Sequence, residues 1–140
     1  MKRRLLLQAT PLTLVLPDLL HAQTAFPAKP IKYIVPVAAG GGSDMVGRTV
    51  TERWGLQLKQ TFVVDNQGGG GGVIASQATA RSAPDGYTLM QGYVSTHGTA
   101  PATRKLPYDP IKDFTPIGMI GATPNVLVVN SALPIKTVAE

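Results

Sequence analysis

The sequence predicts an α/β fold with a mainly parallel sheet and helices on its faces. Short apolar segments rich in β-branched residues alternate along the chain with segments of helical character, which is the pattern of this class. Loops rich in glycine or polar residues follow three of the expected strands. The 140 residues are 44% hydrophobic and 15% charged, a composition typical of about one globular domain.

The first unit is a strand, a glycine turn and a helix. Residues 31–37 are apolar and β-branched, which predicts a buried strand. The glycines at 40–42 allow a sharp turn, and Ser43 or Asp44 is expected to cap a helix that reaches about residue 60. A helix start offers free N–H groups and partial positive charge, so this turn is either an anion cradle or an ordinary connection. The expected apolar face of the helix has the i, i+4 spacing of Val46, Val50, Trp54 and Leu58.

Two further strands and a second helix are expected in the middle of the chain. Residues 61–65 predict a strand, five glycines occupy 68–72, and the alanine-rich residues 73–82 predict a short helix. Residues 83–86 form a turn sequence with proline second and glycine fourth. The third strand is expected over 87–91.

The last part of the chain is expected to complete the sheet. Residues 126–129 are all apolar, so a strand here would be apolar on both faces, which predicts a central position in the sheet. The expected elements are a polar loop over 92–99, one helical turn over 101–105, an irregular segment with two prolines over 106–110, strands over 115–122 and 125–130, and a helix from 134.

Three loops are expected to meet at one edge of this sheet. They cover residues 38–44, 66–72 and 92–99, and each follows a strand. In parallel α/β sheets, ligands bind beyond the carboxyl ends of the strands. The three loops together therefore predict a ligand site, and main-chain N–H groups are the expected contacts with an anion.

The first 22 residues have the organisation of a secretory signal peptide. A basic start with Lys2, Arg3 and Arg4 precedes a short apolar run, which is interrupted by prolines and is too short to span a bilayer. Cleavage is expected after Ala22, with Ala25 as the alternative. The sequence therefore predicts export, by a route that it does not define.

Composition and missing motifs argue against several classes of protein. The chain has no cysteine, and its net charge of +5 includes the basic residues of the expected leader. The remaining basic residues are scattered without interleaved aromatics, so nucleic acid is not expected as a partner. There is no P-loop or Gly-x-Ser-x-Gly motif, and Met45 stands where a dinucleotide fingerprint needs its third glycine. His97 is more typical of a loop donor than of a catalytic base, and no metal site or cofactor is expected.

Five motifs, in order, resemble those of the substrate-binding receptors of tripartite tricarboxylate transporters, the Bug family. The resemblance covers essentially all of residues 26–140. The motifs are Lys29-Pro30-Ile31 with Val35-Pro36, Gly40-Gly41 and Asp44; Val64-Asp65-Asn66 with its glycine run; residues 83–89; residues 105–110 with Lys112-Asp113-Phe114; and residues 124–129.

The resemblance implies a periplasmic receptor of the type II binding-protein fold, in which two α/β domains close on a small organic solute. Residues 23–140 would form the N-terminal lobe, incomplete and without the second domain. The solute would be a di- or tricarboxylate, the other partners would be the membrane components of the transporter, and no enzymatic activity is implied. The ligand-binding residues carried over by position are Ala38, Ala39, Gly40, Gly41, Ser43, Asp44, Ser95 and Thr96.

Two departures from the family pattern affect the loops. Ala38-Ala39 stand where family members usually have two prolines, and Gln67-Gly68 stand where they usually have Arg-Pro. Family receptors are also more than twice as long, so the chain is expected to be a fragment or a truncated gene product. We expect weak or absent dicarboxylate binding by this chain alone. One alternative is an exported α/β enzyme that uses the same loops and whose activity His97→Ala would abolish. The other is a non-functional remnant.

Overall fold

The centre of the fold is a three-stranded parallel sheet in the order β2-β1-β3. The computed structural model describes residues 25–124 and 126–139. The strands are β1 (Ile31–Val35), β2 (Phe62–Asn66) and β3 (Thr88–Met90), with Tyr33 of β1 opposite Val64 and Leu89. The predicted α/β class and parallel pairing are confirmed. The expected signal peptide lies outside the described residues.

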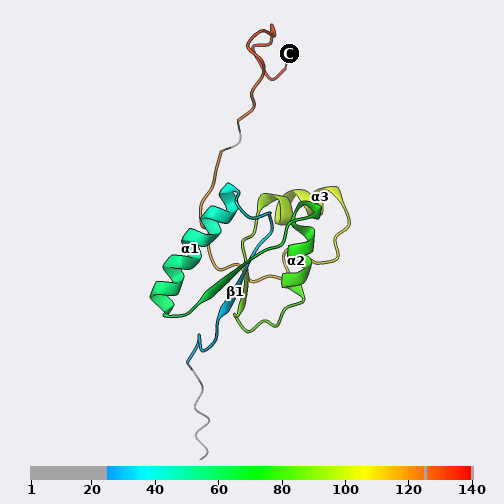
Figure 1. Cartoon of the computed structure of the whole chain (residues 1–140). Coiled ribbons are helices and arrows are strands. Elements are labelled where there is room, and N and C mark those ends of the chain that lie inside the picture. The colour runs from blue at the N-terminus through cyan, green and yellow to red at the C-terminus, as the bar shows by residue number, and fades with distance from the viewer. Residues whose placement is uncertain (1–24, 125, 140) are drawn as a thin grey trace, which may run out of the picture.

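Helices lie on both sides of the strands (Figure 1). The first, α1 (Gly42–Leu58), packs on the sheet face that carries Tyr33 and Val35, since both side chains lie against Gly47 of this helix. The second, α2 (Val73–Ala80), follows the short helix η1 (Gly70–Gly72) and packs against β1 and β3. None of the described helices is long and apolar enough to cross a membrane.

The core is built from β1 and the aromatic residues around it. Ile31, Tyr33, Ile34 and Val35 are each at most 2% exposed. Trp54 of α1 packs edge-on against Tyr33, with ring centroids 6.0 Å apart. These contacts fix α1 on β1, so the turn between them has a defined shape.

The predicted apolar face of α1 is wrong in part. Val46 and Leu58 are 43% and 44% exposed, and the helix instead buries Asp44, Gly47 and Thr51. The reason is steric, because the small Gly47 allows the helix to approach β1 closely. The most buried positions are therefore those next to the small Gly47, and of the predicted row only Val50 and Trp54 are half-buried.

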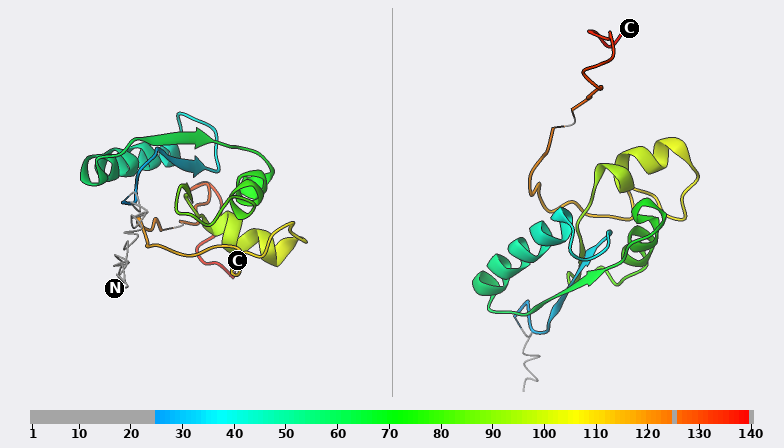
Figure 2. Two further views of the ribbon diagram at one scale, coloured as in Figure 1. Left: turned by 90° about the horizontal axis from the view of Figure 1, so that it is seen from below. Right: turned by 45° about the horizontal axis from the view of Figure 1, so that its top comes forward.

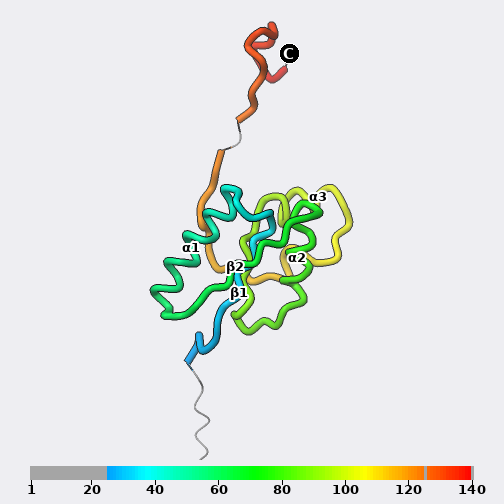
Figure 3. The backbone as a smooth tube through the Cα atoms, in the orientation of Figure 1, coloured from blue at the N-terminus to red at the C-terminus, as the bar shows by residue number. Residues whose placement is uncertain are grey.

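The polar loop expected over 92–99 is helical in its second half. The π-type helix η2 (Ser95–Thr99) runs directly into α3 (Ala100–Thr103), which confirms the helical turn expected nearby. Figure 3 shows the chain leaving this helical region and running back across the molecule to the side on which α1 lies. The helical segment begins earlier than the helical turn expected over 101–105. The Thr96 hydroxyl explains this earlier start, because it accepts a hydrogen bond from the Tyr93 N–H at 3.0 Å.

The strands expected over 115–122 and 125–130 and the helix from 134 are not formed in the described part of the chain. The C-terminal segment, orange to red, extends away from the sheet and helices (Figure 2). Leu127 and Val128 are 77% and 79% exposed. A strand that is apolar on both faces needs neighbouring strands and covering helices, and within the described residues nothing covers this segment.

Candidate functional site

The loops after the three strands lie together at the carboxyl edge of the sheet, as predicted. The Gln67 N–H donates to the Val35 carbonyl and the Gln91 N–H to the Ile34 carbonyl, both at 2.9 Å. These bonds hold the starts of the second and third loops against the end of β1. The parallel register thus creates the site, because all three strands end on the same side.

The first loop presents main-chain N–H groups to open space. Added Cβ atoms at Gly40, Gly41 and Gly42 would meet nothing within 4 Å. The Gly40 N–H donates to Asp44, whereas the N–H groups of Gly41, Gly42 and Ser43 make no hydrogen bond among the described residues. They lie at the start of α1, where the helix dipole adds partial positive charge. Ala38 and Ala39, just before them, are exposed.

Asp44 points into the protein and does not cap α1. The N-cap is Gly41, with no side-chain cap bond, so capping by Ser43 or Asp44 is wrong. Asp44 is 5% exposed, and its carboxylate accepts from Gly40 N at 2.9 Å and from Arg48 Nε at 3.0 Å. These bonds make Asp44 a fixed anchor for the turn.

Asn66, the last residue of β2, completes the cluster around Asp44. Its Nδ2 donates to Asp44 Oδ1 at 3.0 Å, and Arg48 Nη2 donates to Asn66 Oδ1 at 3.2 Å. Hydrogen bonds from Arg48, Gly40 and Asn66 lower the pKa of Asp44 to about 2. Asn66 was expected only as part of the second loop and was not among the predicted ligand-binding residues, although an amide at the end of a strand and before a glycine run was a usable signal.

The two predicted site residues in the third loop have different environments. Ser95 is exposed, whereas Thr96 is fully buried. The Thr96 hydroxyl bonds the Tyr93 main chain and lies 2.7 Å from His97 Nδ1. The Thr96 carbonyl accepts a hydrogen bond from Tyr108 Oη at 2.8 Å. The structure thus brings Ser95 to the surface and uses Thr96 to hold the loop.

His97 is packed against an aromatic side chain. Its ring lies edge-on to Phe114, with centroids 4.8 Å apart, and burial lowers the pKa of its imidazole. No carboxylate among the described residues is hydrogen-bonded to this ring. The described residues therefore do not form a pair of a histidine base and a carboxylate that orients it. Across the part of the chain that the structure describes, no three His, Asp or Glu side chains are grouped as a metal site.

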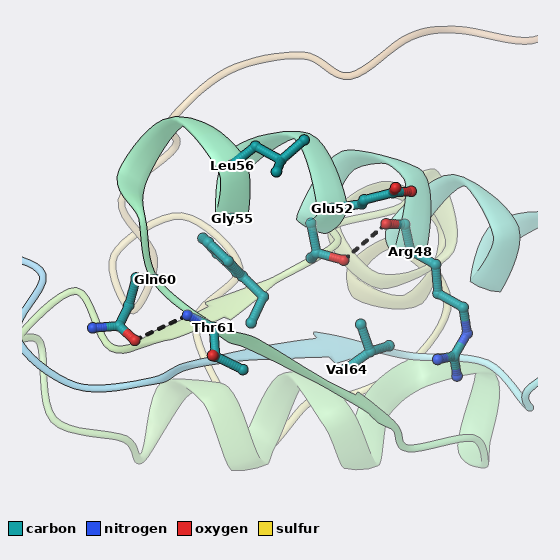
Figure 4. Close-up of a pocket in the computed structure, with 9 residues that line it drawn as sticks. Arg48, Glu52, Gly55, Leu56, Gln60, Thr61 and Val64 are labelled. Atoms are coloured by element: carbon teal, nitrogen blue, oxygen red, sulfur yellow. Dashed lines mark hydrogen bonds between the residues drawn. The ribbon is translucent and has the colours of Figure 1, made fainter.

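Two hollows lie along α1. The larger, about 470 Å³, runs between α1 and β2 from Gln60 to Arg48 (Figure 4). It is not lined by residues of the first or third loop. The smaller, about 310 Å³, lies at the start of α1 and is lined by Gly40, Gly41 and Met45, among others. The smaller hollow is therefore the one next to the first loop, and of Gly41, Gly42 and Ser43 it is lined by Gly41 alone.

The low pKa of Asp44 predicts a specific loss of stability in acid. The folded-state pKa of about 2 lies below the ordinary 3.8, so the stabilisation is complete above about pH 4 and is lost as the pH falls through 2. We expect the free energy of unfolding of Asp44→Asn to depend less on pH between 4 and 2 than that of the parent chain. Urea unfolding at stepped pH measures this difference in pH dependence.

The control is Glu52→Gln, which removes an exposed carboxylate from the same helix. Parallel curves for Asp44→Asn and the parent chain would contradict the assignment.

Residues 46–140 match the family described as Tripartite tricarboxylate transporter family receptor. Protein BugT of Bordetella pertussis is 39% identical over 114 residues, which are 80% of this chain and 35% of BugT. The structure of MatC from Rhodopseudomonas palustris with bound malate has a TM-score of 0.62 and 43% identity, covering 65% of this chain and 31% of MatC. A second R. palustris structure, with adipate, has a TM-score of 0.57 and 33% identity, covering 61% of this chain and 29% of that protein.

The match covers most of this chain but only part of each relative. The chain spans 36% and 35% of the length of two curated relatives, one from Agrobacterium vitis and the other BugT. The similarity therefore covers one part of a longer type of protein, and it includes the sheet edge described above.

Proposed function

This chain belongs to the tripartite tricarboxylate transporter receptor family, and from this premise we propose that it captures a small organic carboxylate for such a transporter. In this proposal residues 1–22 are an export signal, residues 23–140 form the N-terminal α/β lobe of a two-lobe receptor, and the protein works in the periplasm. Its partners are the solute and the membrane components of the transporter. The role involves no catalytic turnover.

One observation carries the proposal. The N–H groups of Gly41, Gly42 and Ser43 are free of hydrogen bonds among the described residues and lie at the positive end of α1. A carboxylate oxygen is the kind of acceptor that such N–H groups bind, and the dipole favours its negative charge. The glycines at 40–42 leave room for a solute to reach the main chain.

The predicted site residues divide into contacts and supports. Ala38, Ala39, Gly40, Gly41 and Ser43 would form the cradle around the carboxylate, and Ser95 would add a hydroxyl from the third loop. Asp44 and Thr96 would act indirectly, because their polar groups are already bonded inside the protein. An inward-facing Asp44 that is paired with Arg48 also repels the solute less than an exposed carboxylate would.

The solute that we propose is a dicarboxylate. MatC holds malate and the second R. palustris structure holds adipate, and both proteins share this fold. One lobe supplies contacts to one end of such a solute and leaves its other side in water. We therefore expect this chain to bind malate with a dissociation constant of about 1 mM, or roughly 4 kcal/mol.

The test compares malate with its uncharged diamide by ligand-observed NMR and calorimetry. We expect saturable, weak binding of malate that weakens further with added salt, and no binding of the diamide. Equal binding of the two compounds would contradict a carboxylate site. Submicromolar binding of malate would contradict the half-site.

A further inference from the structure

We propose that Asn66 is a positioning residue for the solute loop, which we define as residues 37–44. This inference rests on the proposed function, because it assigns Asn66 a role in shaping the loop that would hold the carboxylate. The Asn66 side chain belongs to β2, whereas the solute loop follows β1. The amide would act through Asp44 and the main chain, without touching the solute.

The parallel register places Asn66 next to the loop. Asn66 is paired with Val35 across the sheet, and each is the last residue of its strand. The side chain therefore lies where the chain leaves β1 and enters the solute loop. The contact is long-range, because 22 residues separate Asn66 from Asp44 in sequence.

The Asn66 amide bonds both ends of the solute loop. Its Nδ2 donates to the Val37 carbonyl at 3.3 Å, at the start of the loop, and to Asp44 Oδ1 at 3.0 Å, at the end. The other Asp44 oxygen accepts from the Gly40 N–H at 2.9 Å, in the middle. Asn66 thus fixes the start and the end directly, and the middle through one intermediate carboxylate.

The chemistry of the cluster requires an amide at this position. The two groups facing Nδ2 are a carboxylate and a carbonyl, which only accept, so this atom must be a donor. Its Oδ1 accepts from Arg48 Nη2 at 3.2 Å. An aspartate at position 66 would place a second carboxylate against Asp44, and an alanine would remove every one of these bonds.

Packing supports the start of the loop, where Gly68 lies against Val37 and Ala38, but gives little support to the glycines that follow. Side-chain positions at Gly40, Gly41 and Gly42 face open space, and Ala38 and Ala39 are exposed. Glycines also have the widest conformational freedom, so an unbonded loop would sample many shapes. The hydrogen bonds of Asn66 and Asp44 therefore restrain the loop from Val37 to Gly40, whereas the Gly41 carbonyl also accepts from the Met45 N–H and residues 42–44 belong to α1.

The experiment measures loop order separately from solute binding. Nitrogen-15 relaxation and amide hydrogen exchange are recorded for Gly40, Gly41 and Gly42 in the 140-residue chain and in Asn66→Ala. We expect exchange of the Gly40 N–H, which is hydrogen-bonded to Asp44, to become faster by tenfold or more, and fast motions to increase at all three glycines, with Tyr33 and Ile34 in the core unchanged. The control is Gln67→Ala, because the Gln67 side chain bonds Asp65 at 2.8 Å and not the loop. This control should behave as the parent chain.

Each outcome decides between the role in the loop and a role in the fold. Unchanged exchange at Gly40, or equal acceleration at Ile34, would overturn the positioning role. Where Asn66→Ala does not fold, Asn66→Asp keeps the size of the side chain and should release the loop alone. Failure of both variants to fold would overturn the proposal.

The affinity of the Asn66 variants for malate is measured in parallel and should fall by about tenfold. A released loop with unchanged malate affinity would support positioning by Asn66 and contradict the proposed solute site.

Discussion

Replacing Gly72 by alanine is expected to lower the free energy of unfolding by about 2–5 kcal/mol. Gly72 has φ +89°, and an added Cβ would lie 2.5 Å from Thr96 Cγ2 and 3.2 Å from Pro36 Cβ. The substitution therefore combines an unfavourable left-handed backbone with a steric clash between well-packed groups. Urea unfolding followed by the fluorescence of Trp54, the single tryptophan, measures the change.

The neighbouring glycine provides a matched control. Gly70 also has a positive φ of +57°, but an added Cβ there would meet only Val73 Cβ, at 3.6 Å. Gly70→Ala should therefore cost only the backbone term, about 1–2 kcal/mol. Equal losses for the two variants would show that Thr96 and Pro36 do not close on Gly72. In that case the second and third loops would not meet as described.

Replacing Gly41 by aspartate is expected to abolish malate binding without destabilising the chain. Gly41 is the N-cap of α1, with φ −84° and ψ 170°, and its side-chain position faces open space. Aspartate is a preferred N-cap residue, so we expect stability to be unchanged or to rise by a few tenths of a kcal/mol. Its carboxylate would take the N–H groups at the helix start and repel a second anion. We expect malate affinity to fall more than about tenfold.

Two further substitutions at this position separate charge from size. Gly41→Ala adds a side chain that neither caps nor carries charge, and we expect it to retain most of the malate affinity. Gly41→Asn can occupy the same N–H groups without a negative charge, so its affinity should lie between those of the other two variants. Parent-like malate binding by Gly41→Asp would exclude the start of α1 as the solute site.

The sheet could be predicted because its signals are local. Each strand is a short apolar segment, and alternation with helices is enough to predict parallel pairing. The meeting of the loops follows from that pairing alone. The glycines at 40–42 and the polar Ser43 and Asp44 likewise mark the turn within a few residues of sequence.

The remaining features depend on contacts that no local pattern contains. The buried face of α1 follows Gly47 and Thr51, because a close helix approach favours small residues over the larger Val46 and Leu58. The bond between Asn66 and Asp44 depends on the register of two strands. The strand predicted from the apolar residues 126–129 is wrong for the described chain, because nothing there pairs with or covers this segment, and it remains exposed.

The central claim is that free N–H groups at the start of α1 hold the carboxylate of a metabolite. The most direct measurement is a residue-resolved NMR titration of the nitrogen-15-labelled chain with malate. We expect saturable shifts of the Gly41, Gly42 and Ser43 amide signals, with Gly118 and Gly121 in the C-terminal segment unchanged. Shifts confined to the hollow between α1 and β2, at Gly55 and Thr61, or an absence of shifts at the three N–H groups, would contradict it.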